Sequence, residues 1–305
     1  FHSVAGYSKI GSYTGNGSAN GPMVVTGFKP AFIMIKNATA TYEWTIYDNK
    51  RSPANPRGKV LYPNTTGAEN SGENGDIDFF ANGFQIRGSE GSINQNNGTI
   101  MYMAFADDPD STTLTLADSF NAVTYVGNGS ATARNITTGF KPDLTWIKGR
   151  DTSGKWHVWY DSIRGATNML ASNVTNASTT YGSVTPFSTG FTLATTGGDL
   201  NTNGENYISW NWKAGGDASI NTDGNSNSIV SVNQNAGFSI VRYVGNQTAG
   251  HTIGHGLGAV PEVIIIKCLD STNPWYVYHV AVDSSYPAHY NLRLSATDAR
   301  QDSTT

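Results

Sequence analysis

Short runs in which large apolar residues alternate with small or polar ones fill most of this chain, and this period of two predicts β-strands. Glycine and asparagine bound most of the runs, and Asn82-Gly83 is typical of a hairpin turn. Only residues 164–170 could form a single helical turn. The runs cover residues 23–26, 31–36, 44–48, 59–62, 76–80, 83–87, 99–105, 146–148, 156–160, 190–194 and 207–212. The pattern therefore predicts an all-β chain of antiparallel β-sandwiches, jelly-roll or concanavalin-like, and does not choose between these topologies.

One motif occurs three times and organises the rest of the pattern. Each copy has a glycine-rich turn with a proline, an apolar run rich in β-branched residues, and then one lysine. The copies are GFKPAFIMIKN, GFKPDLTWIKGR and GLGAVPEVIIIKCLD, with their lysines at Lys36, Lys148 and Lys267. The stretches SYTGNGS, TYVGNGS and RYVGNQT precede the copies, and WTIYD, WHVWYD and WYVYH follow them. A spacing of about a hundred residues is a domain length, longer than the ~20–50 residues of a solenoid unit.

The repeat divides the chain into three modules. The expected units are a tail of a preceding repeat (1–6), module 1 (7–108), a linker (109–121), module 2 (122–214), a Gly-, Asn- and Ser-rich linker (215–228) and module 3 (229–305). Compared with module 2, module 3 stops before the GFxL motif and the final aromatic strand. We therefore expect module 3 to lack strands that close its core, which further sequence or a partner chain would supply.

Composition narrows the classes of function. Charged residues make up 14% and aromatic residues 11% of the chain, with a net charge of −4, whereas disorder usually combines few aromatics with high net charge. No basic stripe exists, so we expect no nucleic-acid partner. No apolar run approaches the ~20 residues of a membrane helix, so we expect no membrane insertion. The single cysteine, Cys268, excludes a disulfide within one chain.

The repeated stretches together resemble a repeat module of structural proteins from tailed bacteriophages, often marine phages, which are described as tail-fibre or concanavalin-like. The matching stretches include SYTGNGS, TGFKPAFIMIK and WTIYDNKR in module 1, YVGNGS, TGFKPDLTWIKGR and WHVWYDSIRGATNMLASN in module 2, and GFSIVRYVGN with TIGHGLGAVPEVIIIK in module 3. Module 3 departs at His279, where the other copies have aspartate. The resemblance implies a virion protein, assembled in the bacterial cytoplasm and extracellular after release. Its implied partners are other virion proteins, further copies of itself and host-surface polysaccharide, and it carries over no catalytic residue and no cofactor.

Three functions remain open from the sequence. The leading expectation is a fibre, spike or appendage component that binds host-surface glycans through many weak contacts. The first alternative is a purely architectural capsid or tail decoration protein. The lesser alternative is a polysaccharide-degrading glycosidase, which needs two carboxylates ~5–10 Å apart. Module 1 offers Glu69, Glu73, Asp76 and Asp78, but module 2 has no match for the last two, so we expect no enzyme.

Two aspartates are shared at a landmark of the repeat. Asp48 and Asp161 are each followed three residues later by an arginine, Arg51 or Arg164. A structural salt bridge or a turn cap is the favoured interpretation of this pair.

We expect no metal site. His251 and His255 are four residues apart, but the glycine between them argues against a helix, and no third ligand follows at a suitable spacing. Two pairs of carboxylates would suit calcium, Asp76 with Asp78 and Asp107 with Asp108. Aspartates that cap turns are the more common explanation for both pairs.

Aromatic residues are the candidate ligand-binding residues, because a flat apolar ring with a polar edge suits a sugar. The candidates are Trp44, Trp156, Trp159, Trp275 and Tyr276. Tryptophan in an alternating strand is more often part of the core, and this interpretation competes with the first. Ligand contacts on variable loops, at residues 38–43, 64–75 and 173–181, are a further alternative.

Overall fold

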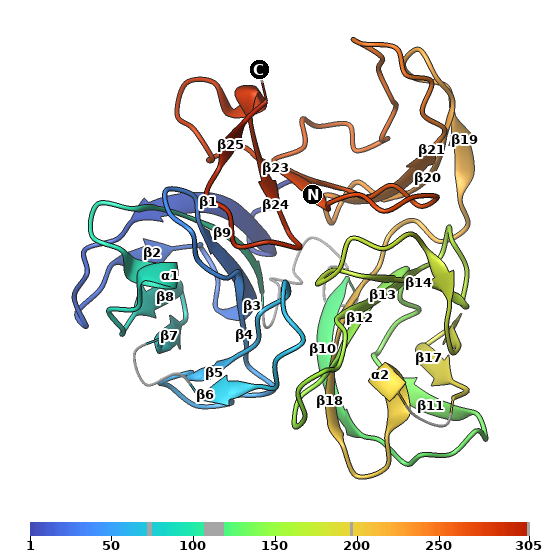
Figure 1. Cartoon of the computed structure of the whole chain (residues 1–305), viewed down its shortest axis with the longest axis horizontal. Coiled ribbons are helices and arrows are strands. Elements are labelled where there is room, and N and C mark those ends of the chain that lie inside the picture. The colour runs from blue at the N-terminus through green and yellow to red at the C-terminus, as the bar shows by residue number, and fades with distance from the viewer. Residues whose placement is uncertain (72–74, 107–118, 196–197, 304–305) are drawn as a thin grey trace.

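The computed structural model describes residues 1–71, 75–106, 119–195 and 198–303. Their sheets are antiparallel at every paired strand, with only three short helical segments. The predicted fold class, all-β with antiparallel sandwiches, is confirmed. Figure 1 shows the three modules as three lobes around a common centre.

Module 1 is a sandwich of two sheets with a small two-stranded sheet at its edge. Its elements are β1 (Ser8–Thr14), β2 (Met23–Val25), β3 (Pro30–Asn37), β4 (Thr45–Asp48), β5 (Lys59–Val60), β6 (Asn70–Ser71), β7 (Ile77–Phe80), β8 (Gly83–Ile86), α1 (Gly91–Asn94) and β9 (Thr99–Ala106). The large sheet has the order β1-β9-β3-β4 and the small one β2-β8-β7, while β5 pairs with β6. The last strand of the module, β9, thus lies in the middle of the large sheet.

Module 2 repeats this plan. Its elements are β10 (Phe120–Val126), β11 (Arg134–Thr137), β12 (Leu144–Gly149), β13 (Val158–Asp161), β14 (Asn168–Ala171), β15 (Thr179–Thr180), β16 (Val184–Phe187), β17 (Gly190–Leu193), α2 (Gly198–Asn201) and β18 (Asn206–Trp212). The sheets have the orders β10-β18-β12-β13-β14-β15 and β11-β17-β16. The helical turn that residues 164–170 could have formed is absent, because this segment is a turn that leads into strand β14. Most of the expected linker 109–121 lies outside the described residues, and its last two residues belong to β10.

Module 3 contains two separate sheets. Its elements are β19 (Ser219–Asn221), β20 (Ser228–Asn233), β21 (Phe238–Tyr243), β22 (Val263–Ile266), β23 (Tyr276–His279), the 3₁₀-helix η2 (Pro287–His289), β24 (Tyr290–Arg293) and β25 (Gln301–Asp302). Their orders are β19-β20-β21 and β22-β23-β24-β25. The expected linker 215–228 therefore contains a strand, β19, which pairs with β20. Its polar composition is that of an exposed strand at the edge of a sheet.

The central strands are buried on both faces, which explains their continuous apolar runs. In β3, Ile33 and Ile35 face the interior of module 1. Phe32 and Met34 alternate with them and point into a central core, to which all three modules contribute residues. The three modules are therefore packed against one another and share one core.

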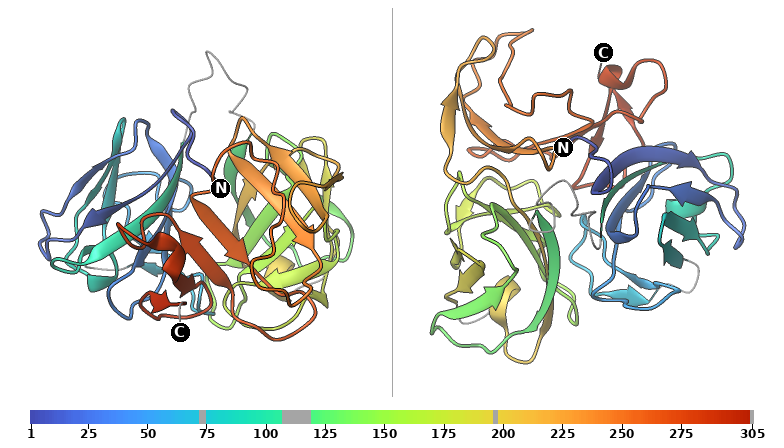
Figure 2. Two further views of the ribbon diagram at one scale, coloured as in Figure 1. Left: turned by 90° about the horizontal axis from the view of Figure 1, so that it is seen from above. Right: turned by 180° about the vertical axis from the view of Figure 1, so that it is seen from behind.

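Three aromatic residues mark a pseudo-threefold axis in this central core. Phe105 lies near the end of β9, Trp212 ends β18, and Phe1 occupies the equivalent place beside β22. Their ring centroids form a triangle with sides of 5.8 Å (Phe1–Phe105), 6.2 Å (Phe1–Trp212) and 5.6 Å (Phe105–Trp212), and each pair meets edge to face. This is a favoured aromatic geometry. In both views of Figure 2 the N-terminus lies between the lobes, and the single chain folds as an internal trimer.

Candidate functional site

The structure buries three of the five aromatic residues that the sequence offers for ligand binding. Trp44, Trp159 and Trp275 are only 3%, 8% and 2% exposed and belong to the central core. A sugar could not stack on these rings without opening that core, so a ligand-binding role does not fit them and the competing core interpretation does. Trp156 is half-buried against the interior of module 2. Tyr276, on β23, is 41% exposed.

The buried indoles connect neighbouring modules. The Trp44 Nε1–H donates to the backbone carbonyl of Arg293 in module 3 at 3.0 Å. The Trp275 Nε1–H donates to the carbonyl of Ala171 in module 2, also at 3.0 Å. Arg293 and Ala171 each follow a buried leucine of β24 or β14. The same contact therefore occurs at two different junctions.

In module 2, His157 occupies the repeat position of Trp44 and Trp275. An alignment of Trp156 with these two tryptophans is therefore wrong by one residue. His157 lies four residues before the shared aspartate, as Trp44 does, whereas Trp156 lies five before it. The buried imidazole accepts a hydrogen bond from Trp146 Nε1 at 3.1 Å and interacts with the backbone of Tyr62 in module 1. Burial, and then nearby positive charges, lower the pKa of His157 well below its ordinary value, so the ring is neutral.

Each junction is also closed by two backbone hydrogen bonds, which we call the clasp. The residue two positions after a repeated lysine accepts one bond, and the residue six positions after it donates the other. The six N–H···O bonds measure 2.7–3.0 Å: Tyr42 to Thr297 and Arg300 to Ala38, Gly154 to Thr66 and Glu69 to Arg150, Asn273 to Thr175 and Ser178 to Leu269. Every module thus uses one surface toward one neighbour and a different surface toward the other. Such head-to-tail contacts form a closed ring when the rotation between units suits three copies.

Each repeated lysine donates a hydrogen bond to a backbone carbonyl at the beginning of a clasp. Lys36 and Lys148 are fully buried, and each ammonium donates to the carbonyl of the next residue at 2.8 Å. Lys36 also reaches across its junction to the Thr297 carbonyl at 3.2 Å. Lys267 makes the same local bond at 2.8 Å and is less buried. Burial lowers the pKa of Lys36 and of Lys148 to about 8.

The shared aspartates are structural, as the sequence predicts. Asp48 accepts the backbone N–H of Arg51 at 2.8 Å and its Nε–H at 2.6 Å. Asp161 accepts the same two groups of Arg164. In module 3, His279 replaces the aspartate and its Nδ1 accepts a backbone N–H two residues later at 3.1 Å. All three side chains therefore cap the turn that follows their strand.

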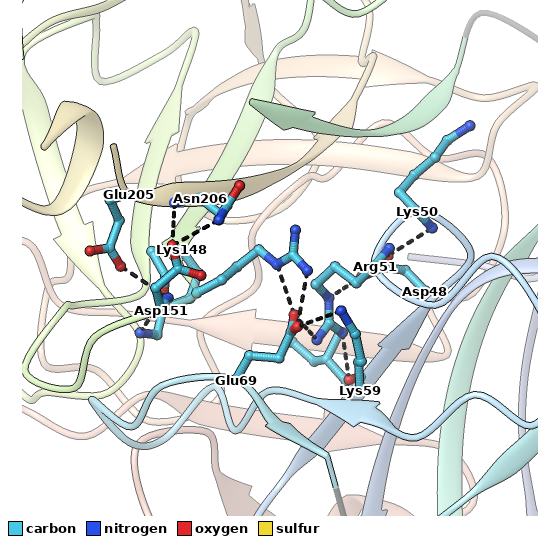
Figure 3. A network of polar contacts seen from close by, with 12 residues as sticks. Asp48, Lys50, Arg51, Lys59, Glu69, Lys148, Asp151, Glu205 and Asn206 are labelled. Atoms are coloured by element: carbon cyan, nitrogen blue, oxygen red, sulfur yellow. Dashed lines mark hydrogen bonds and ion pairs between the residues drawn. The ribbon is translucent and has the colours of Figure 1, made fainter. Parts of the chain in front are cut away.

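A charged network at the junction of modules 1 and 2 is centred on Glu69 (Figure 3). Its carboxylate accepts two hydrogen bonds from Arg150 of module 2, at 2.8 and 2.9 Å. Arg51 Nη1 lies 3.3 Å and Lys59 Nζ 3.5 Å from its oxygens. Burial alone would raise the pKa of Glu69, but the hydrogen bond from Arg150 and the surrounding positive charges lower it by more. This candidate glycosidase carboxylate is thus an ionised structural group.

The other described carboxylate candidates are Asp78, on β7, and Asp76, just before this strand. Asp78 pairs with Arg87 at 3.3 Å. Burial, and then the nearby charge of Asp78, raise the pKa of Asp76. No group of three or more His, Cys, Asp or Glu residues that could hold a metal occurs among the described residues. Glu73, Asp107 and Asp108 lie outside them.

A hollow of about 530 Å³ opens on module 3. His255 of the predicted histidine pair lines it, together with Ile253, four glycines and the polar residues Asn221, Asp223, Gln234 and Thr252. The Asn221 amide donates to the Asp223 carboxylate at 3.2 Å on one wall. Amide, carboxylate and imidazole groups arranged in this way can exchange hydrogen bonds with the hydroxyls of a sugar.

The fold and the junctions define an all-β protein of three repeated modules closed into a ring. No helix in the described part of the chain is long and apolar enough to cross a membrane. A family model described as a domain of unknown function, DUF7483, matches residues 1–109 and 115–305, and the chain belongs to this family. Comparisons with curated proteins and with solved structures find no match.

Proposed function

We propose that this protein is a structural component of a tailed-phage virion, in a fibre, spike or surface appendage, and that it is not an enzyme. One observation carries the proposal: the side chains that repeat along the chain are used to hold the modules together. A repeated catalytic or metal site would instead bring repeated polar groups to an open surface. A component of a particle needs modules that stay firmly associated. The resemblance of the repeat to phage structural modules also supports the proposal.

Location in the particle tests this proposal. Purified phage particles that carry this chain would be labelled with an antibody against it and imaged by electron microscopy. Label on a fibre, spike or other appendage supports the proposal, whereas label on the capsid shell favours the purely architectural decoration role. Absence of the chain from purified particles would contradict both roles.

Adhesion to host-surface polysaccharide is the second part of the proposal, and the hollow of module 3 favours it. Its Asp223 carboxylate and Gln234 amide lie on exposed loops, where ligand contacts are commonly found. Each contact would be weak, and the many copies of an appendage would multiply them.

A binding assay with matched variants tests adhesion. A multimerised form of the protein is expected to bind host polysaccharide, and Asp223→Asn with Gln234→Ala should reduce binding at least tenfold. Asp217→Asn removes an exposed charge outside the hollow and serves as the control. Equal binding by all variants would remove the hollow from the proposal, and no binding by the parent would leave only the architectural role.

A further inference from the structure

The small sheet of module 1 turns one face to solvent, on the side of the module away from the common centre (Figure 1). Val24, Phe79 and Phe84 point from strands β2, β7 and β8 into the interior of the module, so their neighbours along each strand point outward. We call these outward side chains the outer face. They are Met23, Val25, Asp78, Phe80, Gln85 and Arg87, with Gly83 between Val25 and Phe80.

The outer face is apolar at one end. Val25, Gly83 and Phe80 lie side by side across the three strands. Val25 and Phe80 are 61% and 39% exposed, and Met23, in the next row, is 47% exposed. Gly83 has no side chain to cover the flank of the Phe80 ring, so part of this ring is open to a ligand.

The other end of the outer face carries polar groups in fixed positions. Arg87 Nε lies 3.3 Å from the Asp78 carboxylate, and the Arg87 Nη1–H donates to Gln85 Oε1 at 3.2 Å. The Gln85 amide donates in turn to Asn20 Oδ1 and to the Gly21 carbonyl, both at 3.3 Å. The Arg87 side chain is still 44% exposed. Its guanidinium has several N–H donors, and these bonds hold it where a ligand on the sheet can reach it.

Module 2 keeps the aromatic residue and the glycine of this face but not the residues around them. Phe187 lies opposite Gly190 as Phe80 lies opposite Gly83, and a Cβ on Gly190 would lie 3.1 Å from Phe187 Cζ. A ring over a strand glycine supports a hairpin, which explains why the pair recurs. The other counterparts are Asn135 for Met23, Thr137 for Val25, Thr185 for Asp78, Thr192 for Gln85 and Ala194 for Arg87. Of these two faces, only that of module 1 combines an apolar end with an ion pair.

The size and the charge of the outer face indicate the kind of occupant. A stable protein interface uses about 20–30 residues from each partner, whereas the outer face offers six side chains. A pyranose ring is smaller, and its apolar C–H face and polar hydroxyls suit an aromatic ring beside fixed polar groups. Asp76 precedes Asp78 by two residues, so this end has two carboxylates and one guanidinium. This balance of charge suits a neutral sugar better than an acidic one.

We propose that the outer face of module 1 binds one neutral pyranose unit of a polysaccharide. The sugar packs its C–H face against Phe80 and Val25, and its hydroxyls exchange hydrogen bonds with Arg87 and Asp78. This inference rests on the adhesion part of the proposed function and adds a site on a different module from the hollow around Asp223. Each copy of the chain then offers two weak sites, and the many copies of an appendage multiply both.

A titration followed by NMR tests the proposal on the whole chain. The probes are three neutral oligosaccharides, maltohexaose, cellohexaose and mannohexaose, and one acidic oligosaccharide, hexagalacturonate. The backbone amide signals of Gly83 and Gln85 are the readout, because every variant of module 1 keeps these two residues. We expect at least one neutral probe to shift both signals in a saturable way, and hexagalacturonate to bind at least about tenfold more weakly.

Two variants of module 1 and one of module 2 identify the residues that act. Phe80→Ala should weaken binding of the neutral probe about tenfold, because it removes the stacking ring. Met23→Asn with Val25→Thr gives the outer face the residues of module 2 and should weaken binding to a similar degree. Both replacements already occur in strand β11, so this variant should keep the fold. Phe187→Ala is the matched control and should leave binding at Gly83 unchanged.

The reciprocal exchange should transfer the site to module 2. It places the residues of the outer face on the equivalent positions, and the amide signal of Gly190 should then respond to the same neutral probe. The replacements are Asn135→Met, Thr137→Val, Thr185→Asp, Thr192→Gln and Ala194→Arg. A folded protein with these replacements whose Gly190 signal does not respond would show that these residues do not make the site.

Three other results would overturn the proposal. The first is no shift at Gly83 and Gln85 with any neutral probe, and the second is equal binding by the parent and both variants of module 1. The third is a shift at Gly83 that grows with protein concentration without sugar, which would identify a second copy as the occupant. Host polysaccharide that binds the chain without shifting these signals would exclude the outer face and leave the adhesion proposal standing. Shifts with a neutral probe but no binding of host polysaccharide would support the site and contradict adhesion.

Discussion

The central core should make the three modules unfold as one unit, and replacing one ring of the aromatic triangle tests this coupling. Phe105 is 1% exposed and meets Phe1, which lies beside β22 of module 3, and Trp212 of module 2. Phe105→Ala removes the contacts that one residue makes with all three modules. The matched variant is Phe191→Ala, since Phe191 is fully buried in the interior of module 2 alone.

The expected magnitudes follow from burial and ring contacts. Replacing a buried phenylalanine by alanine destabilises a protein by about 3–5 kcal/mol, through lost burial and the cavity that remains. Phe105 also meets five aromatic rings at 5.2–6.1 Å, and each such pair contributes about 0.5–1.5 kcal/mol, although not additively. We therefore expect Phe105→Ala near the upper end of the range and Phe191→Ala nearer the lower end.

Native-state hydrogen exchange, followed by mass spectrometry of peptides from each module, separates the two variants. Phe105→Ala should speed exchange in the strands of all three modules, whereas Phe191→Ala should act mainly on β11, β16 and β17. If Phe105→Ala speeds exchange only in module 1, the central core does not couple the modules and the internal-trimer interpretation is wrong.

Three further predictions concern single junctions. Glu69→Gln should lower the free energy of unfolding by about 1–3 kcal/mol at low salt, because it leaves Arg150 without its carboxylate partner in a mostly buried network; chemical denaturation checks this, and an unchanged value would contradict it. The free energy of unfolding should rise from about pH 8 toward 10, because Lys36 and Lys148 lose protons near pH 8 when folded but keep them to about 10.5 when unfolded. Lys36→Met should reduce this slope by about half, and an unchanged slope in a pH series of denaturation curves would refute the role of its burial. Trp44→Phe leaves the carbonyl of Arg293 without its partner, so we expect a loss of about 1–2 kcal/mol; faster exchange confined to the clasp between modules 1 and 3 would support this, and equal exchange at every clasp would not.

The strands could be predicted because each module buries its sheets in a regular alternation. The run at residues 99–105 becomes β9 (Thr99–Ala106), and the hairpin at Asn82-Gly83 connects β7 with β8. Gly83 has a φ of +153°, and a Cβ there would lie 2.0 Å from the Val24 carbonyl oxygen. Only glycine fits such a close approach of two backbones. Local chemistry of this kind is readable from a sequence.

The partner across each buried face could not be predicted in the same way. Alternation assigns Phe32 and Ile33 to opposite faces of a strand, but it does not say that one face meets another module. The triangle of Phe1, Phe105 and Trp212 brings together residues that are far apart in the chain, and no local pattern links them. The role of His157, in contrast, could have been predicted. Counting back four residues from the shared aspartate would have aligned it with Trp44 and Trp275.

The repeated residues of this chain mark its junctions and not a repeated chemical site. The indole or imidazole that follows the lysine by eight or nine residues, and the two clasp residues between them, act where one module meets the next, and Lys36 also donates across its junction. These junction residues recur in each module because a closed ring of three modules needs the same two contact surfaces on every one of them. A function that belongs to one place should then depend on residues that do not repeat. One such place is the hollow around Asp223, which lies on module 3, the module that departs furthest from the other two.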